Sequence, residues 1–203
     1  FVGGDTVAGA AGGIDVTGIQ NIDLRDGADS VTLEDGTALS GTLSGGTGDD
    51  TLTGNASGAA FAVTAANAGT VDTDPVTGAD IDFSSVENLT GGVGDDTFDV
   101  DADLSGDLDG GAGTNTLDLA AGATIGGTVS NVDVTLSVTG AGGDDDIVIR
   151  RNGSGVLEAE VNGSVSQFFT PVGPLNISLT VDGAGGTDTL TLDYASGALP
   201  NEI

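Results

Sequence analysis

The sequence contains no cysteine, methionine, tryptophan, histidine or lysine. The lack of cysteine excludes disulfides, CxxC redox chemistry and thiolate metal sites. The further lack of histidine and lysine removes most of the general bases and nucleophiles that enzymes use. Aromatic residues make up 3% of the chain, so a core built on large side chains is not expected. These absences predict a protein that is not an enzyme.

Positive charge is almost missing as well. Three arginines, Arg25, Arg150 and Arg151, stand against 32 acidic residues, and the formal net charge is −29. Nucleic acids and anionic membrane surfaces are bound through a basic face, so neither is an expected partner. No apolar run approaches the ~20 residues that span a bilayer, so no membrane insertion is expected. The partners that this chain attracts by charge are cations.

Glycine, which occurs 37 times, and aspartate form a repeated frame. In each copy two apolar residues stand nine positions apart, with glycine and aspartate between them. The copies are Ile22/Val31, Leu43/Leu52, Leu89/Phe98, Leu108/Leu117, Val138/Ile147 and Val181/Leu190. Their spacing predicts stacked units of ~20–23 residues, and the two longest intervals predict weaker units near residues 66–69 and 161–163.

Two longer matches predict how the units lie over one another. Residues 14–33 align with residues 81–100 without a gap, which places Val31 at the position of Phe98. Residues 134–149 align with residues 177–192, 43 positions later. We therefore divide the chain into regular units (1–133) and a region of 43-residue repeats (134–203), within a single segment (1–203) that we expect to belong to a longer array.

Apolar residues alternate with Thr, Ser and Asp within each unit, as in residues 132–138. This period of two indicates strands with one buried face, and the density of glycine opposes helices. The predicted fold is all-β, a right-handed parallel β-helix (β-solenoid) with coils of about 20–23 residues. For residues 147–181, where Asn-Gly pairs favour hairpin turns, two alternatives stay open: an ordinary coil with long corners, or an antiparallel hairpin arm that projects from the solenoid.

The corner sequences GGTGDDTLT (45–53) and GGVGDDTFD (91–99) resemble the calcium-binding nonapeptide G-G-x-G-x-D-x-U-x of the repeats-in-toxin, or haemolysin-type, proteins. Residues 110–118, 140–148 and 183–191 match it less completely, and residues 26–32 keep its later positions. Ca²⁺ prefers six to eight oxygen ligands, which carbonyls and carboxylates of two stacked corners can supply. The alternative is that these are solvated Gly-Asp corners without a metal.

The resemblance implies a set of Ca²⁺ ligands in this chain. Carried over by position, the side-chain ligands are Asp29, Asp50, Asp96, Asp145 and Asp188, with Asn115 in the aspartate place of its copy and Asp5 in a degenerate one. The glycines that would donate carbonyl oxygens are Gly46, Gly48, Gly92 and Gly94. In the family the nonapeptides run in tandem, whereas here each predicted coil holds at most one, so few sites are expected.

These features predict a structural segment of a large secreted or cell-surface protein, of the adhesin, filament or surface-layer type, stabilised by calcium. The expected partners are further copies of the chain or neighbouring repeats of a parent chain. The alternatives are a β-helical enzyme that acts on polysaccharides, and a module that binds a glycan or itself. The enzyme would have Arg25, Arg150 and Arg151 to bind an acidic sugar, whereas the binding module would use Arg150 and Arg151 within residues 147–181.

Overall fold

The computed structural model describes residues 6–8, 20–37, 39–73, 80–120, 122–172 and 175–199 of the chain. They form nineteen β-strands, and no helix occurs among them. The predicted all-β class is therefore confirmed. No helix in this part of the chain is long and apolar enough to cross a membrane.

The strands form two sheets, and most neighbouring strands are parallel. The ten-stranded sheet contains, in spatial order, β1 (Thr6–Ala8), β3 (Ser30–Thr32), β5 (Thr51–Thr53), β9 (Asn88–Thr90), β11 (Leu108–Asp109), β13 (Thr128–Ser130), β17 (Ser164–Pro171), β16 (Leu157–Val161), β15 (Asp146–Arg151) and β19 (Thr189–Asp193). The nine-stranded sheet contains β18 (Asn176–Asp182), β14 (Asp133–Thr139), β12 (Thr116–Leu119), β10 (Thr97–Val100), β6 (Ala60–Ala65), β7 (Ala68–Asp72), β8 (Asp80–Ser84), β4 (Thr42–Ser44) and β2 (Ile22–Asp23).

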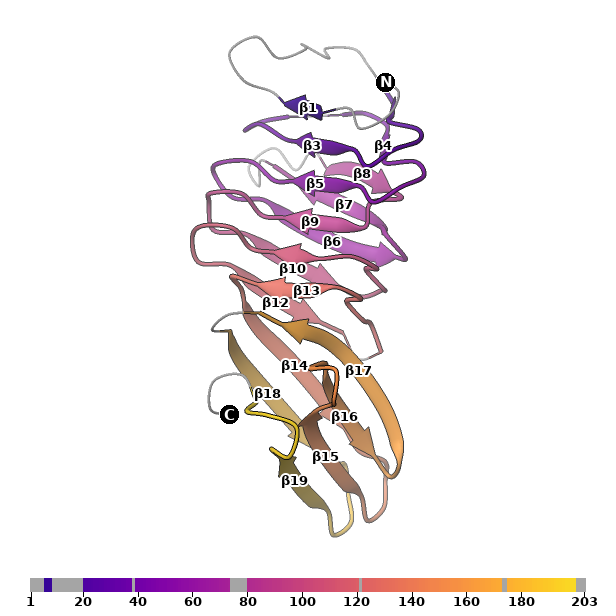
Figure 1. Cartoon of the computed structure of the whole chain (residues 1–203), viewed down its shortest axis with the longest axis vertical. Helices are drawn as coiled ribbons and strands as arrows, with labels where there is room; N and C mark the ends of the chain where they lie inside the picture. The colour runs from indigo at the N-terminus through magenta and orange to yellow at the C-terminus, as the bar shows by residue number, and fades with distance from the viewer. Residues whose placement is uncertain are drawn as a thin grey trace.

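The chain passes alternately from one sheet to the other, and the strands stack along an elongated body (Figure 1). We call one strand of each sheet, with the two connections that link them, a layer. Ile22 of β2 pairs in parallel with Leu43 of β4, and Leu89 of β9 pairs with Leu108 of β11. Hydrogen-bonded positions in adjacent layers are 21 or 19 residues apart. The predicted parallel pairing is thus confirmed for these layers; a spacing of 21 lies within the predicted 20–23 residues, and a spacing of 19 lies just below it.

One hydrophobic core lies between the two sheets. Along β14 the side chains alternate between exposed and buried, so that Val134, Leu136 and Val138 face the core. Phe61 and Phe98 stack in neighbouring strands with their ring centroids 5.0 Å apart. Leu89 and Phe98, the apolar pair of the central repeat, are 1% and 2% exposed. Burying each such side chain stabilises the fold by about 1.5–3 kcal/mol.

The predicted alignment of residues 14–33 with residues 81–100 is wrong as a spatial register. Val31 lies in the ten-stranded sheet, where it pairs with Leu52, whereas Phe98 lies in the nine-stranded sheet and pairs with Leu117. Both kinds of connection between the sheets carry the same apolar and Gly/Asp pattern, but in different layers: Ile22/Val31 connects β2 to β3, whereas Leu89/Phe98 connects β9 to β10. The pattern alone therefore does not show to which sheet an apolar residue belongs. The alignment of residues 134–149 with 177–192 is confirmed, because Val134 pairs with Ile177 and Ile147 with Leu190.

The two long intervals contain inserted antiparallel strands, not the weaker units that were predicted. Between β5 and β9 the chain forms β6, β7 and β8, which lie side by side in the nine-stranded sheet. The turn between β6 and β7 includes Asn67 at φ 53°. Positive φ angles are typical of tight hairpin turns, and Asn tolerates them better than most residues.

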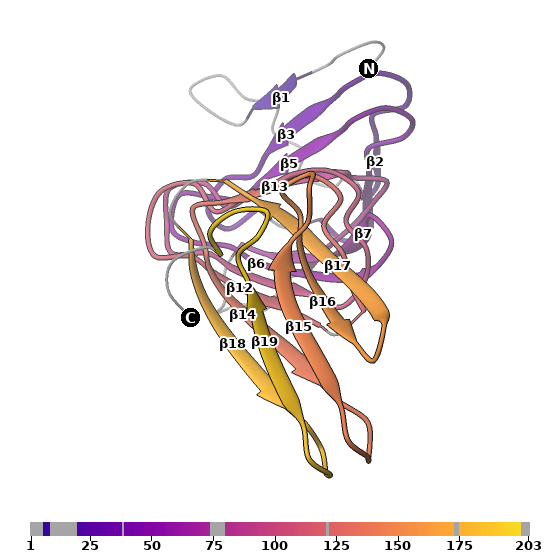
Figure 2. The same ribbon diagram turned by 60° about the horizontal axis from the view of Figure 1, so that its bottom comes forward.

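The second insertion lies within residues 147–181 and forms β15, β16 and β17, paired antiparallel. This agrees with the antiparallel alternative. The turn between β16 and β17 contains Asn162 and Gly163 at φ 52° and 83°. The three strands are neighbours within the ten-stranded sheet, between β13 and β19, and Figure 2 shows them reaching beyond the shorter strands of the stack.

Candidate metal-binding corners

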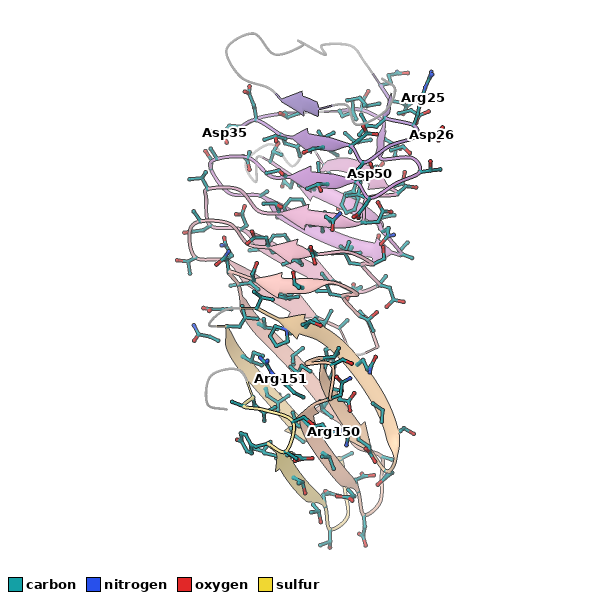
Figure 3. The ribbon with its side chains drawn as sticks, viewed as in Figure 1. Arg25, Asp26, Asp35, Asp50, Arg150 and Arg151 are labelled. Atoms are coloured by element: carbon teal, nitrogen blue, oxygen red, sulfur yellow. The ribbon has the colours of Figure 1, made fainter. Side chains whose placement is uncertain are left out.

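The predicted ligands lie on two opposite edges of the body. Connections from the nine-stranded to the ten-stranded sheet form the first edge, and connections in the other direction form the second edge. Figure 3 shows Arg25, Asp26 and Asp50 on the first edge and Asp35 on the second. The first edge holds Asp29, Gly46, Gly48, Asp50, Asp145 and Asp188, and the second edge holds Gly92, Gly94, Asp96 and Asn115. Asp5 lies outside the described residues.

Three pairs of predicted ligands come together in adjacent layers. Asp50 Oδ1 accepts the backbone N–H of Asp29 at 2.8 Å. Asn115 Oδ1 accepts the N–H of Asp96 at 2.9 Å. In the last layers Asp188 Oδ1 accepts the N–H of Asp145 at 3.0 Å. The sixth residue of the motif therefore joins each corner to its neighbour, and this contact requires no metal.

These side chains are buried, although aspartate is rarely fully buried. Asp29, Asp50, Asp96, Asn115 and Asp145 are between 0% and 3% exposed. Asp188, in the last layer, is exposed. Burial raises the pKa of Asp50; the hydrogen bond from Asp29 opposes this, and the nearby carboxylates of Glu87, Asp29 and Asp49 raise the pKa further. Burial also raises the pKa of Asp96, against the hydrogen bond from Ala59 and with help from Asp95.

In Asn115 the terminal atom that does not bond to the neighbouring N–H, Nδ2, faces a backbone carbonyl. Its Nδ2 donates to the backbone carbonyl of Asn131 at 3.0 Å. A methyl group added at Gly110 would collide with this carbonyl and come within 2.7 Å of Asn115 Nδ2. Both atoms therefore lie over the first glycine of the motif.

The aspartates have the same arrangement with an oxygen in place of the NH₂ group. Asp96 Oδ2 and the Gly110 carbonyl lie over Gly91, and Asp50 Oδ2 and the Ser85 carbonyl lie over Gly45. Both Oδ2 atoms are buried without a hydrogen-bond partner. Two acceptors that face one site in a dry corner repel each other unless a proton or a cation lies between them.

The glycines of the motif are needed for the close stacking of the corners. Gly46 and Gly48 have φ angles of 105° and 145°. A Cβ on Gly46 would collide with the Arg25 carbonyl, and a Cβ on Gly48 with the Gly27 carbonyl, both in the preceding layer. The Gly92 carbonyl, a predicted ligand, accepts the Ala112 N–H at 2.9 Å. Gly94 packs against the backbone of Gly58. The Gly92 carbonyl is thus already used between layers.

Glu87 and Asn67 take part in the first edge and were not predicted. Glu87 Oε2 accepts the N–H of Asp50 at 2.9 Å. In the β8–β9 connection Glu87 thus has the role that the sixth motif residue has in the other corners. Asn67, at the tip of the β6–β7 hairpin, donates to Glu87 Oε1 at 3.2 Å and to Ser105 Oγ at 2.9 Å. The hairpin tip therefore completes the corner stack where the insertion interrupts it. No sequence signal distinguishes Glu87, because its role depends on the insertion.

Arg150 is paired within the chain. Its Nε lies 2.7 Å from Glu158 Oε1 and its Nη1 2.7 Å from Glu160 Oε2. Glu158 is 4% exposed and also accepts bonds from Asn152 and Gln167. Burial raises the pKa of Glu158, but the bonds from Gln167, Asn152 and Arg150 outweigh it and lower the pKa overall. Arg150 therefore holds β15 against β16.

The described side chains of a corner do not provide enough ligands for a complete Ca²⁺ site. Among the residues that the structure describes, no group of three or more acidic side chains could hold a metal ion. The corners of Asp50 and Asp96 instead each offer one buried carboxylate oxygen beside one carbonyl oxygen. Both are hard donors of the kind that Ca²⁺ prefers, but Ca²⁺ takes six to eight of them.

Comparisons with protein-family models, curated proteins and solved structures gave no match to this chain.

Proposed function

We propose that the chain is a right-handed β-solenoid segment with a structural, non-enzymatic role in a large secreted or cell-surface protein, of the adhesin, filament or surface-layer type. The observation that supports this most is the use of the acidic residues. Asp50, Asp96 and Asp188 each accept a backbone N–H from a neighbouring layer. Carboxylates used in this way hold layers together and are not free to act on a substrate.

The exposed aspartates of the corners follow the same rule. Asp103 and Asp107 each accept the N–H and the hydroxyl of a threonine in the next layer. Asp95 accepts the N–H of Thr114 at 2.7 Å. Water competes with hydrogen bonds at exposed carboxylates, so each bond contributes little by itself. Their repetition between successive layers is what supports a stiff, self-supporting stack.

Calcium in the Gly/Asp corners is part of the proposal, and the resemblance to repeats-in-toxin proteins motivates it. The buried Oδ2 atoms of Asp50 and Asp96, each beside a carbonyl oxygen, support a positive occupant. Water or further carbonyls would have to supply the rest of the Ca²⁺ shell. The test is thermal unfolding in calcium and in EGTA, followed by circular dichroism. An unchanged midpoint would remove calcium from the proposal.

An enzyme that acts on polysaccharides is the alternative, and a groove with a free basic residue would favour it. Arg150, one of the three arginines expected to bind an acidic sugar, is paired with Glu158 and Glu160. The hollow on the second edge that includes Asp35 and Asn55 has no aromatic residue among its described lining. Release of unsaturated or reducing sugar from uronate polymers would overturn the structural role and revive this alternative.

A further inference from the structure

The outer face of the ten-stranded sheet carries hydroxyl groups in three successive strands. β3, β5 and β9 lie side by side in the stack (Figure 1). Each of them has one buried residue between two residues whose side chains face outward. We call the six outward residues the hydroxyl face: Ser30, Thr32, Thr51, Thr53, Asn88 and Thr90.

These side chains form two straight rows across the strands. Thr53 pairs with Thr32 on one side and with Thr90 on the other. Thr51 in the same way pairs with Ser30 and Asn88. Neighbouring strands lie about 4.7–4.9 Å apart, and outward residues of one strand about 6.6–6.8 Å apart. The hydroxyl face is therefore a flat array with two regular spacings.

The hydroxyl groups are held in place but not used within the molecule. The buried residues between them, Leu52 and Leu89, are 0% and 1% exposed and anchor β5 and β9 in the core. Threonine is β-branched, so its side chain has few rotamers and its hydroxyl and methyl groups point in fixed directions. Among the described residues, none bonds to the hydroxyls of Ser30, Thr32, Thr51, Thr53 and Thr90.

The hydroxyl face is uncharged, although the chain carries a net charge of −29. On the outer face of the nine-stranded sheet, by contrast, Asp82, Asp99 and Asp118 point outward, and Asp99 and Asp118 are direct neighbours. The hydroxyl face ends at β11 with Asp109, whose carboxylate accepts a bond from Asn131 at 2.7 Å. Charge therefore does not select the partner of this face.

The chemistry of the face favours ordered water as its partner. A protein or a sugar would remove liquid water from the hydroxyls, which costs free energy unless each hydroxyl regains a partner. None of the six residues is aromatic or a large aliphatic residue whose burial would offset this cost. Ice is a lattice of water molecules, so hydroxyls that meet it keep hydrogen bonds to water. A regular array also matches a crystal better than a single molecule.

We propose that the hydroxyl face binds the surface of ice crystals. The hydroxyl and methyl groups of the two rows order the contacting water, and the flat sheet holds them at fixed spacing. This inference goes beyond the proposed structural role, and it requires neither calcium nor a particular neighbour at the ends of the stack.

The test is uptake of the purified chain into a slowly grown ice crystal, with amino-acid analysis of the ice and of the remaining liquid. Thr53→Tyr raises a ring above the middle of the array and keeps a side chain that favours strands. Thr135→Tyr is the matched control, because Thr135 points outward from β14 in the other sheet. We expect the wild type and Thr135→Tyr to enter the ice. Uptake of Thr53→Tyr should be roughly tenfold lower, equivalent to ~1.4 kcal/mol of binding free energy.

Thermal hysteresis, the gap between the melting and freezing points of a crystal in the protein solution, provides the second readout. It should be present for the wild type and reduced for Thr53→Tyr. Thr90→Tyr repeats the change in the neighbouring strand, and the unfolding midpoint of each variant shows whether it is folded. Exclusion of the wild type from ice, or equal uptake of the folded variants of the two sheets, would overturn the proposal. Exclusion from ice together with binding to crystalline chitin or cellulose would replace it by a polysaccharide surface.

Discussion

Replacing Asp96 by asparagine should stabilise the protein in the absence of calcium. Asp96 is 0% exposed, and its Oδ1 accepts the Ala59 N–H at 2.7 Å. Its Oδ2 is buried beside the Gly110 carbonyl and has no hydrogen-bond partner. In the next layer Asn115 directs an NH₂ group at the equivalent carbonyl and bonds to it at 3.0 Å. Asp96→Asn reproduces this arrangement and keeps the Oδ1 bond.

The expected gain follows from the unpaired oxygen. A buried polar atom without a partner costs about 1–3 kcal/mol, and the variant replaces it with a bonded donor. For a chain of this length 1 kcal/mol shifts the unfolding midpoint by about 2–4 °C, so the midpoint should rise by roughly 2–12 °C. Asn115→Asp should lower it by a similar amount, because it removes the bond to Asn131 and adds a buried charge.

The assay is thermal unfolding followed by circular dichroism, in EGTA and in calcium. Asp118→Asn is the control for the loss of one negative charge, because Asp118 lies on the exposed face of β12; its midpoint should change little. A midpoint for Asp96→Asn at or below that of the wild type in EGTA would refute the reasoning. If Ca²⁺ binds at Asp96, the wild type gains stability in calcium and the order of the two proteins reverses. If the order is the same in both buffers, this corner holds no calcium.

Three further predictions concern pH, the inserted strands and the glycines. Burial raises the pKa of Asp50 and Asp96 above the usual aspartate value of 3.8, so their contribution to stability is complete below that value and is lost as pH rises through the raised pKa. The stability gained by Asp96→Asn, measured by chemical denaturation, should therefore be smaller at about pH 4 than at pH 7. Arg150→Ser leaves Glu158 buried without its cation, so the midpoint should fall, and hydrogen exchange in β15 and β16 should accelerate before the rest; unchanged exchange there would contradict the role given to Arg150. Gly48→Ala forces a side chain into a φ of 145° and against the Gly27 carbonyl, which should cost roughly 1–3 kcal/mol, whereas Gly153→Ala, where a Cβ meets nothing within 4 Å, should cost much less.

Local patterns were enough to predict the all-β class and the core. The alternation in residues 132–138 places Val134, Leu136 and Val138 inward, as found. The 43-residue repeat also predicted the pairing of Val134 with Ile177. These features depend on the period of two within a strand and on the length of a layer, and both can be read from neighbouring residues.

The register across the sheets could not be predicted in the same way. Leu43 and Leu89 have the same local context, but Leu43 lies in the nine-stranded sheet and Leu89 in the ten-stranded sheet. The inserted strands also leave β5 to pair directly with β9, a pairing across 37 residues that no local pattern indicates. The Asn-Gly turn at 162–163 was recognisable, whereas the turn at Asn67 has no glycine in it and therefore gives a weaker signal.

The motif that suggested calcium has a second physical explanation, and the two can be separated at one atom. The first oxygen of the side chain bonds a backbone N–H of a neighbouring layer, and asparagine does this as well as aspartate, as Asn115 shows. The first glycine is required in either case, because the side chain and a carbonyl both lie over it. Aspartate and asparagine therefore differ in the second atom alone. At positions 50 and 96 an asparagine NH₂ group would donate a hydrogen bond to the neighbouring carbonyl. Aspartate is therefore the more stabilising residue only when a proton or a cation binds to its Oδ2. The corners that hold aspartate are thus the ones in which a calcium-dependent change in stability has to be sought.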